Sequence, residues 1–211
     1  MRARLLVLTV GHGSGAAVDL GTGALLRLHW PVGDDERGGE RGKPALAPFD
    51  IVEVDARNDD GLPFPLDSVV AAGEPVPCGR LTGRRAERLL RPLVHPVSQP
   101  LLGGPTPTVP YWTLRDDQPT IALVDPSAGP VVQRDARLSL RCRFRWRRLD
   151  HDLPLDDPTV EQRLSHPTCV ELRGGTLARA LGWRPHRLVV ALAPPDEGLC
   201  QKVVAGLLPK P

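Results

Sequence analysis

The stretch Arg-Leu-Ser-Leu-Arg-Cys-Arg-Phe-Arg-Trp-Arg-Arg, residues 137–148, alternates apolar side chains with Arg or Ser. A period of two is typical of a β-strand with one buried and one solvated face, because successive strand residues point to opposite sides of a sheet. The residues predicted to be buried are Leu138, Leu140, Cys142, Phe144 and Trp146. Those predicted to face solvent are Arg137, Ser139, Arg141, Arg143, Arg145 and Arg147.

The solvated face of this strand resembles a ladder of guanidinium groups. Side chains on one face of a strand repeat every ~6.6 Å, which is close to the spacing of phosphates along an extended single strand. We therefore predict that the ladder binds single-stranded DNA or RNA through its phosphates. The candidate nucleic-acid-binding residues are Arg137, Arg141, Arg143, Arg145 and Arg147, together with Trp30 at the end of a predicted strand and Lys202 in the last predicted strand.

Two other interpretations of the ladder stay open. Only three of the 27 basic residues are lysines, so arginine is the usual cation of this chain, and the ladder can be a solvated face partly paired to Asp and Glu. It can also bind an acidic protein partner. The net charge of +2 gives no general preference for polyanions, but residues 134–148 carry a local charge of +6 and leave about −4 for the rest.

The chain contains 24 Pro and 21 Gly, and these residues interrupt many short apolar runs. This pattern favours a mainly β fold with a few short helices. We predict two tandem OB-like small β-barrels. Residues 1–81 form the first barrel, residues 82–118 a helical and Pro-rich connector, and residues 119–211 the second barrel. Thr82 begins a helix in the connector, and the Asp156-Asp157-Pro158 stretch begins another in the second barrel.

No stretch of the sequence supports a catalytic centre. Gly11-His12-Gly13-Ser14-Gly15 follows an apolar run, but no helix fits before the next Gly-rich turn, so we interpret it as a turn. The four Cys are widely spaced and lack metal-ligand spacing. We therefore expect no catalytic residues, no metal and no cofactor. A hydrolase or nuclease with a site between the barrels remains the alternative.

The first apolar run, Leu5–Val10, is too short for a signal peptide, and no segment has the length of a membrane span. We expect a cytoplasmic protein with reduced thiols and no membrane partner.

Four stretches together resemble the dual OB-domain family of bacterial proteins. The first is the opening strand, turn and hairpin that ends in Leu-Arg-Leu-His-Trp-Pro at 26–31. The others are Phe-Asp-Ile-Val-Glu-Val at 49–54, then Cys-Arg-Phe-Arg-Trp at 142–146 with His-Asp-Leu-Pro-Leu-Asp-Asp-Pro at 151–158, and the two closing apolar segments at 188–194 and 198–208. The resemblance implies two fused small barrels and a role in nucleic-acid or nucleotide binding, in settings related to defence. It implies no catalytic residues.

Overall fold

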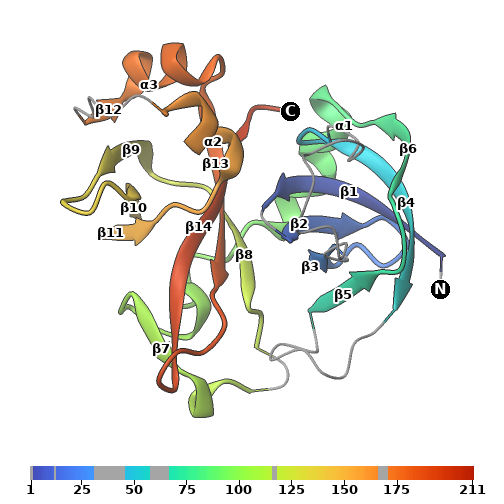
Figure 1. Ribbon diagram of the computed structural model, residues 1–211, viewed down its shortest axis with the longest axis horizontal. Coiled ribbons are helices and arrows are strands. Elements are labelled where there is room, and N and C mark those ends of the chain that lie inside the picture. Colours follow the sequence, from blue (N-terminus) through green and yellow to red (C-terminus); the bar gives the residue numbers. More distant parts are fainter. Residues whose placement is uncertain (1, 12, 31–45, 58–66, 116–117, 166–170) are drawn as a thin grey trace, which may run out of the picture.

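The computed structural model describes residues 2–11, 13–30, 46–57, 67–115, 118–165 and 171–211. The described chain is mainly β, with a few short helices, and it forms two barrel-like units that lie next to each other (Figure 1). The predicted fold class is confirmed.

The first unit is a closed barrel of five strands. Its strands are β1 (Arg2–Val10), β2 (Ser14–Asp19), β3 (Leu25–His29), β4 (Asp50–Arg57) and β5 (Ser68–Ala71). Their order around the barrel is β1-β2-β3-β5-β4, and β4 pairs again with β1. The β3–β5 pair is parallel and the other pairs are antiparallel. This is the strand order of an OB-fold. A sixth strand, β6 (Val76–Arg80), is added along β4.

The second unit is a sheet curled into a half-barrel. Its strands are β7 (Thr108–Pro110), β8 (Ile121–Val124), β9 (Ala128–Arg134), β10 (Leu140–Trp146), β11 (Leu149–Pro154), β12 (Leu172–Arg173), β13 (Pro185–Leu192) and β14 (Leu199–Pro209). Because β8 and β9 follow each other closely, they act as one bent strand, which pairs with β13 through β8 and with β10 through β9. A parallel bridge between Leu155 and Val204 joins the end of β11 to β14. The second unit thereby repeats the strand order of the first.

Helices fill the connections between strands. They are α1 (Gly83–Leu90), η1 (Arg91–Leu93), η2 (Leu101–Gly103), η3 (Tyr111–Thr113), α2 (Pro158–Arg163) and α3 (Gly174–Leu181). As predicted, Asp157 caps α2, since its Oδ1 accepts hydrogen bonds from the backbone N–H of Thr159 and Val160. Gly182 closes α3 with a φ of 86°, a conformation that favours glycine. Both helices lie between the third and fourth strands of the second unit, where an OB-fold carries its helix.

Three apolar cores hold the molecule together. One lies inside the first barrel around Leu5, Leu28 and Val52, and one inside the second unit around Phe144 and Trp146. The third core lies between the units. Its buried members are Leu6, Leu8, Ala16, Val18, Phe49, Leu90, Ile121, Leu123, Val189, Ala191 and Leu208. The two units therefore share a continuous apolar interface rather than a flexible joint.

The connector packs against both units. Leu90 of α1 is buried in the shared core, and β7 pairs with β14 of the second unit. The boundaries 1–81, 82–118 and 119–211 stay a prediction, because the shared core gives no independent measure of where one unit ends.

Candidate nucleic-acid interface

The candidate interface is the outer face of the sheet β9–β10–β11 in the second unit. OB-folds hold oligonucleotides on the face of their second and third strands and on the loops beside it. In the second unit these strands are β10 and β11. The apolar side chains Leu140, Cys142, Phe144 and Trp146 point inward and are buried, as predicted. Arg141, Arg143 and Arg145 consequently point outward from β10.

The start of the predicted strand is corrected by the structure. Strand β10 begins at Leu140, while Leu138 has a φ of 65° and is 60% exposed instead of buried. The cause is Asp135, whose Oδ1 accepts hydrogen bonds from the backbone N–H of Arg137 and Ser139. This side chain stabilises a turn that competes with the strand. Arg137 therefore lies in the turn beside the sheet.

The three central arginines each face a carboxylate of the same chain. Arg141 Nε lies 2.8 Å from Asp152 Oδ1, Arg145 Nε lies 3.8 Å from Asp150 Oδ1, and Arg143 donates to Glu171. Strand pairing sets two of the acids on this face, because β11 brings Asp152 and Asp150 opposite β10. The open alternative of an arginine face partly paired to Asp and Glu is thus what the described residues display.

The arginines at the two ends of the ladder differ from the central three. Arg147 follows β10 in a turn, lies 5.7 Å from the ring centroid of Trp146 and donates to the backbone oxygen of Gln99 at 3.0 Å. Arg137 and Arg147 are both exposed and form no ion pair with an acid of the described chain. At these two positions an outside anion therefore meets no competing carboxylate of the described chain.

Lys202 cannot belong to this interface, because its side chain is completely buried. Its Nζ donates to the backbone oxygens of Gly104 and Thr106, at 2.5 and 2.7 Å, and so ties the connector to β14. Burial lowers the pKa of Lys202 to about 8. The sequence carried a signal for this position, since Lys202 is two residues from both Cys200 and Val204, which point inward on the same strand.

Trp30 is not brought into the ladder either. It follows β3 in the first unit, where it is half-buried and packs against the barrel interior around Leu28. Two other aromatic side chains are much more exposed. Tyr111 and Trp112 of η3 are 44% and 73% exposed, and the backbone N–H of Tyr111 donates to the oxygen of Gly198 in the β13–β14 turn.

The corresponding face of the first barrel is covered. Its outward residues Ala16 and Val18 on β2 belong to the shared core, and Leu25 of β3 packs against it. Arg27 of β3 is 8% exposed and donates to the backbone oxygen of Leu192 in the second unit at 2.6 Å. The second unit is therefore the one whose described β10–β11 face is open to solvent.

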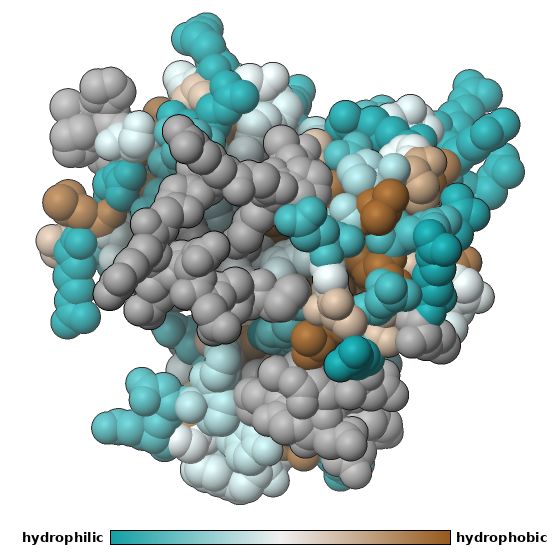
Figure 2. All heavy atoms as spheres, turned by 45° about the vertical axis from the view of Figure 1, so that its right-hand side comes forward, coloured by the Kyte–Doolittle hydropathy of each residue, from teal (hydrophilic) through white to brown (hydrophobic). Residues whose placement is uncertain are grey.

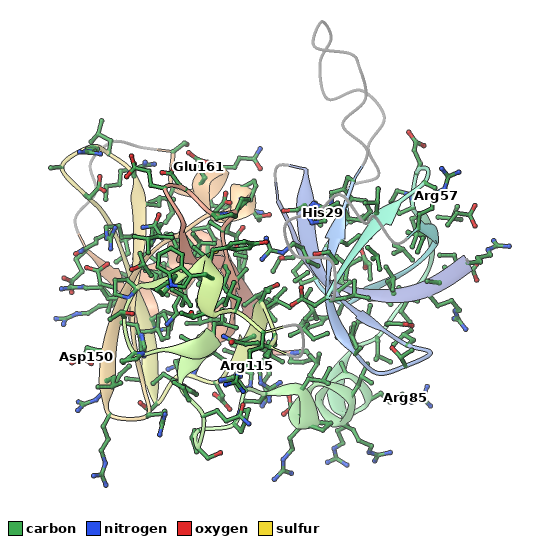
Figure 3. All side chains as sticks on the ribbon, turned by 90° about the horizontal axis from the view of Figure 1, so that it is seen from below. His29, Arg57, Arg85, Arg115, Asp150 and Glu161 are labelled. Carbon is green, nitrogen blue, oxygen red and sulfur yellow. The ribbon has the colours of Figure 1, made fainter. Side chains whose placement is uncertain are left out.

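A second basic surface was missed in the sequence. Arg84, Arg88 and Arg91 are exposed and line one hollow together with Glu87 and Pro92. The signal for it was the spacing of four and three residues, which brings side chains to one side of a helix. Figure 3 places Arg85 of α1 and Asp150 of β11 in separate parts of the molecule.

The described residues contain no group of three or more His, Cys, Asp or Glu that could hold a metal ion. No helix in the described ranges is long and apolar enough to span a membrane. On the face shown in Figure 2, hydrophobic residues of the described chain lie in small groups among hydrophilic ones.

No protein-family model matches the chain, and no curated protein matches it. The dual OB-domain family consequently stays a prediction from the sequence.

Proposed function

We propose that this chain is a non-catalytic protein that binds single-stranded nucleic acid by its phosphates, on the outer β10–β11 face of the second unit. The observation that carries the proposal is the position of the ladder. Arg141, Arg143 and Arg145 lie on the strand face that OB-folds use for oligonucleotides. Arg145 is exposed and Arg141 and Arg143 are half-buried, while the counterpart of this face in the first barrel is covered.

In this proposal the carboxylates that pair with the ladder compete with the ligand for the arginines. An exposed ion pair contributes only ~0–1 kcal/mol, because water and salt screen both charges. Arg141 donates one hydrogen bond to the Asp152 carboxylate, whereas a guanidinium that binds phosphate can donate two parallel ones. Asp150 and Asp152 remain next to the bound strand and repel it. We therefore expect modest affinity that falls steeply with salt.

Base contacts in this proposal come from stacking rather than from hydrogen-bonded readout. The loop between the fourth and fifth strands flanks the ligand face of an OB-fold, and here it is the β13–β14 turn. Tyr111 and Trp112 contact this turn at Gly198 and expose their rings. Aromatic stacking on a base contributes ~1–3 kcal/mol and depends little on sequence.

The test is the salt dependence of binding to a fluorescent oligothymidine or oligouridine of about 12 nucleotides, within the range that one OB-fold covers. Three phosphate contacts give a slope of log K against log salt near −2, or about an eighteen-fold loss of affinity from 50 to 200 mM salt. The triple change Arg141→Gln, Arg143→Gln, Arg145→Gln should remove most of this slope. Arg2→Gln, which changes an exposed arginine paired to Glu53 on the first barrel, is the matched control.

The proposal is rejected if the wild-type chain does not bind either oligonucleotide at low salt, or if the triple variant keeps the wild-type slope.

We also propose a cytoplasmic location, in agreement with the free thiols of Cys78, Cys142 and Cys200.

A second candidate is an acidic protein partner. It is favoured by Leu138 and Leu149, which are 60% and 47% exposed at the two ends of β10. Exposed apolar residues beside charged ones are more typical of a protein interface than of a phosphate track. Leu149→Ser should leave oligonucleotide binding unchanged under our main proposal.

A further inference from the structure

The second basic surface lies on α1, which is held firmly against the rest of the molecule. Ala86 and Leu90 are completely buried, and Leu90 belongs to the core shared by the two units. These anchors leave Arg84 and Arg88 exposed on the helix, and Arg91 follows directly in η1. The guanidinium groups therefore project from a rigid base.

The three arginines lie around one open depression of the surface. Arg84, Arg88 and Arg91, with Glu87 and Pro92, line an open hollow of about 560 Å³. Residues 84 and 88 are separated by ~6 Å along the helix axis, given a rise of ~1.5 Å per residue. This separation is close to the distance between neighbouring phosphates in an extended strand.

The charge of this hollow is not neutralised from within the described chain. Glu87 is its one acidic lining residue, and both of its oxygens accept hydrogen bonds from Arg187, at 2.9 and 2.5 Å. This pairing lowers the pKa of Glu87. No acid of the described residues forms an ion pair with Arg84, Arg88 or Arg91. Lys210 and His186 lie close enough to Glu87 to affect it electrostatically.

The α1 arginines differ from the ladder arginines in their ion pairing. Arg141, Arg143 and Arg145 each have a carboxylate partner, whereas the α1 arginines have none among the described residues. Guanidinium groups that share a hollow without counter-charge attract an anion from solution, and their planar donors match phosphate oxygens.

We propose that the hollow lined by Arg84, Arg88 and Arg91 is a second site for a run of phosphates, separate from the β10–β11 face. The identity of its ligand as a nucleic-acid backbone rests on the proposed function. Inorganic polyphosphate has the same repeating phosphate chemistry, and it serves as the second probe.

The test compares Arg84→Gln, Arg88→Gln, Arg91→Gln with Arg85→Gln in the full chain. Arg85 is exposed on the same helix but does not line the hollow, so it is a matched control. Binding of a fluorescent oligothymidine and of polyphosphate is measured between 50 and 200 mM salt, with melting temperature as the check of folding. We expect the triple variant to lose polyphosphate binding and to remove about 2 from the oligonucleotide salt slope, in addition to the slope near −2 that the three ladder contacts give, since each lost single-strand contact removes about 0.7. Arg85→Gln should keep it.

The outcomes separate this inference from the proposed function. If the ladder variant loses oligonucleotide binding and the α1 variant loses neither ligand, the α1 site is rejected alone. If the wild-type chain binds polyphosphate but not the oligonucleotide, and the α1 variant loses polyphosphate, the proposed function fails and the α1 phosphate site stands. A wild-type chain that binds neither probe overturns both.

Discussion

Phe144 is a core residue of β10, and its two neighbours in the sequence lie on the outer face of the same strand. Its ring is 3% exposed and stacks on His151, with ring centroids 5.1 Å apart. Its neighbours Arg143 and Arg145 carry charge on the opposite face of the same strand. The buried apolar residues and the outward arginines of β10 can therefore be substituted independently.

Phe144→Ala should reduce the free energy of unfolding by about 3–5 kcal/mol, because it leaves a cavity in a closely packed core. Leu138→Ala is the control, since Leu138 is 60% exposed and should change stability by less than about 0.5 kcal/mol. Urea unfolding measures both. Equal effects of the two substitutions would contradict the register described for β10.

Two buried histidines make stability depend on pH. His95 and His151 both pack near Trp146, with ring centroids 5.5 and 6.2 Å from its ring. Burial lowers the pKa of both imidazoles, and the charge of Lys202 lowers them further. A base whose pKa is lowered by folding binds fewer protons in the folded state than in the unfolded state.

Stability should therefore be fully present above the ordinary histidine pKa of about 6.5 and should fall as the pH drops below it. Urea unfolding at a series of pH values from about 8 to about 5 follows this loss over the range where histidine titrates. A urea midpoint that stays constant over that range would show that folding does not lower the pKa of these histidines.

At the scale of elements, the sequence predicted the type of most segments but not every boundary. The period of two in residues 140–146 predicted β10 because the core accepts each second side chain. The same period failed at Leu138, where the Asp135 turn replaces strand pairing. Lys202 was predicted to bind nucleic acid because of its charge, but its spacing from Cys200 and Val204 places it on the inward face of β14, where it is buried.

The cap of α2 is a testable element. Asp157 accepts hydrogen bonds from Thr159 and Val160 with one oxygen, and from Leu207 of β14 with the other. Asp157→Ala should cost roughly 1–2 kcal/mol of unfolding free energy, at the upper end of the range for lost caps. Asp156→Ala, at the exposed neighbouring position, should cost far less. Thermal melting of the two variants should separate them, and identical melting temperatures would contradict the role given to Asp157.

At the scale of the whole molecule, the tandem barrel arrangement was predictable from paired strand-and-turn patterns, whereas the contact between the barrels was not. The continuous apolar run Leu5–Val10 indicates that β1 is buried on both faces, but it does not identify what covers the outer face. The structure shows Leu6 and Leu8 packed in a core shared with Val189 and Ala191. For the same reason the pairing of Arg143 with Glu171 could not be predicted, since the two residues are distant in the sequence.

The shared core predicts that the two units unfold together. Leu8, Leu90 and Val189 contribute to one apolar cluster, so unfolding either unit exposes the core of the other. Calorimetry should give one transition whose calorimetric and van't Hoff enthalpies agree. Two resolved transitions would show that the units are independent.

The central claim is that Arg141, Arg143 and Arg145 are phosphate contacts for which Asp150 and Asp152 compete. The most direct measurement is the affinity of Asp150→Asn, Asp152→Asn for a fluorescent oligothymidine at fixed salt. Glu53→Gln, Asp55→Asn changes the net charge equally on the first barrel, where Glu53 pairs with Arg2, and so controls for charge alone. Our account predicts that the Asp150 and Asp152 variant binds more tightly than both the wild-type chain and the control. Equal affinity of the two variants would contradict it.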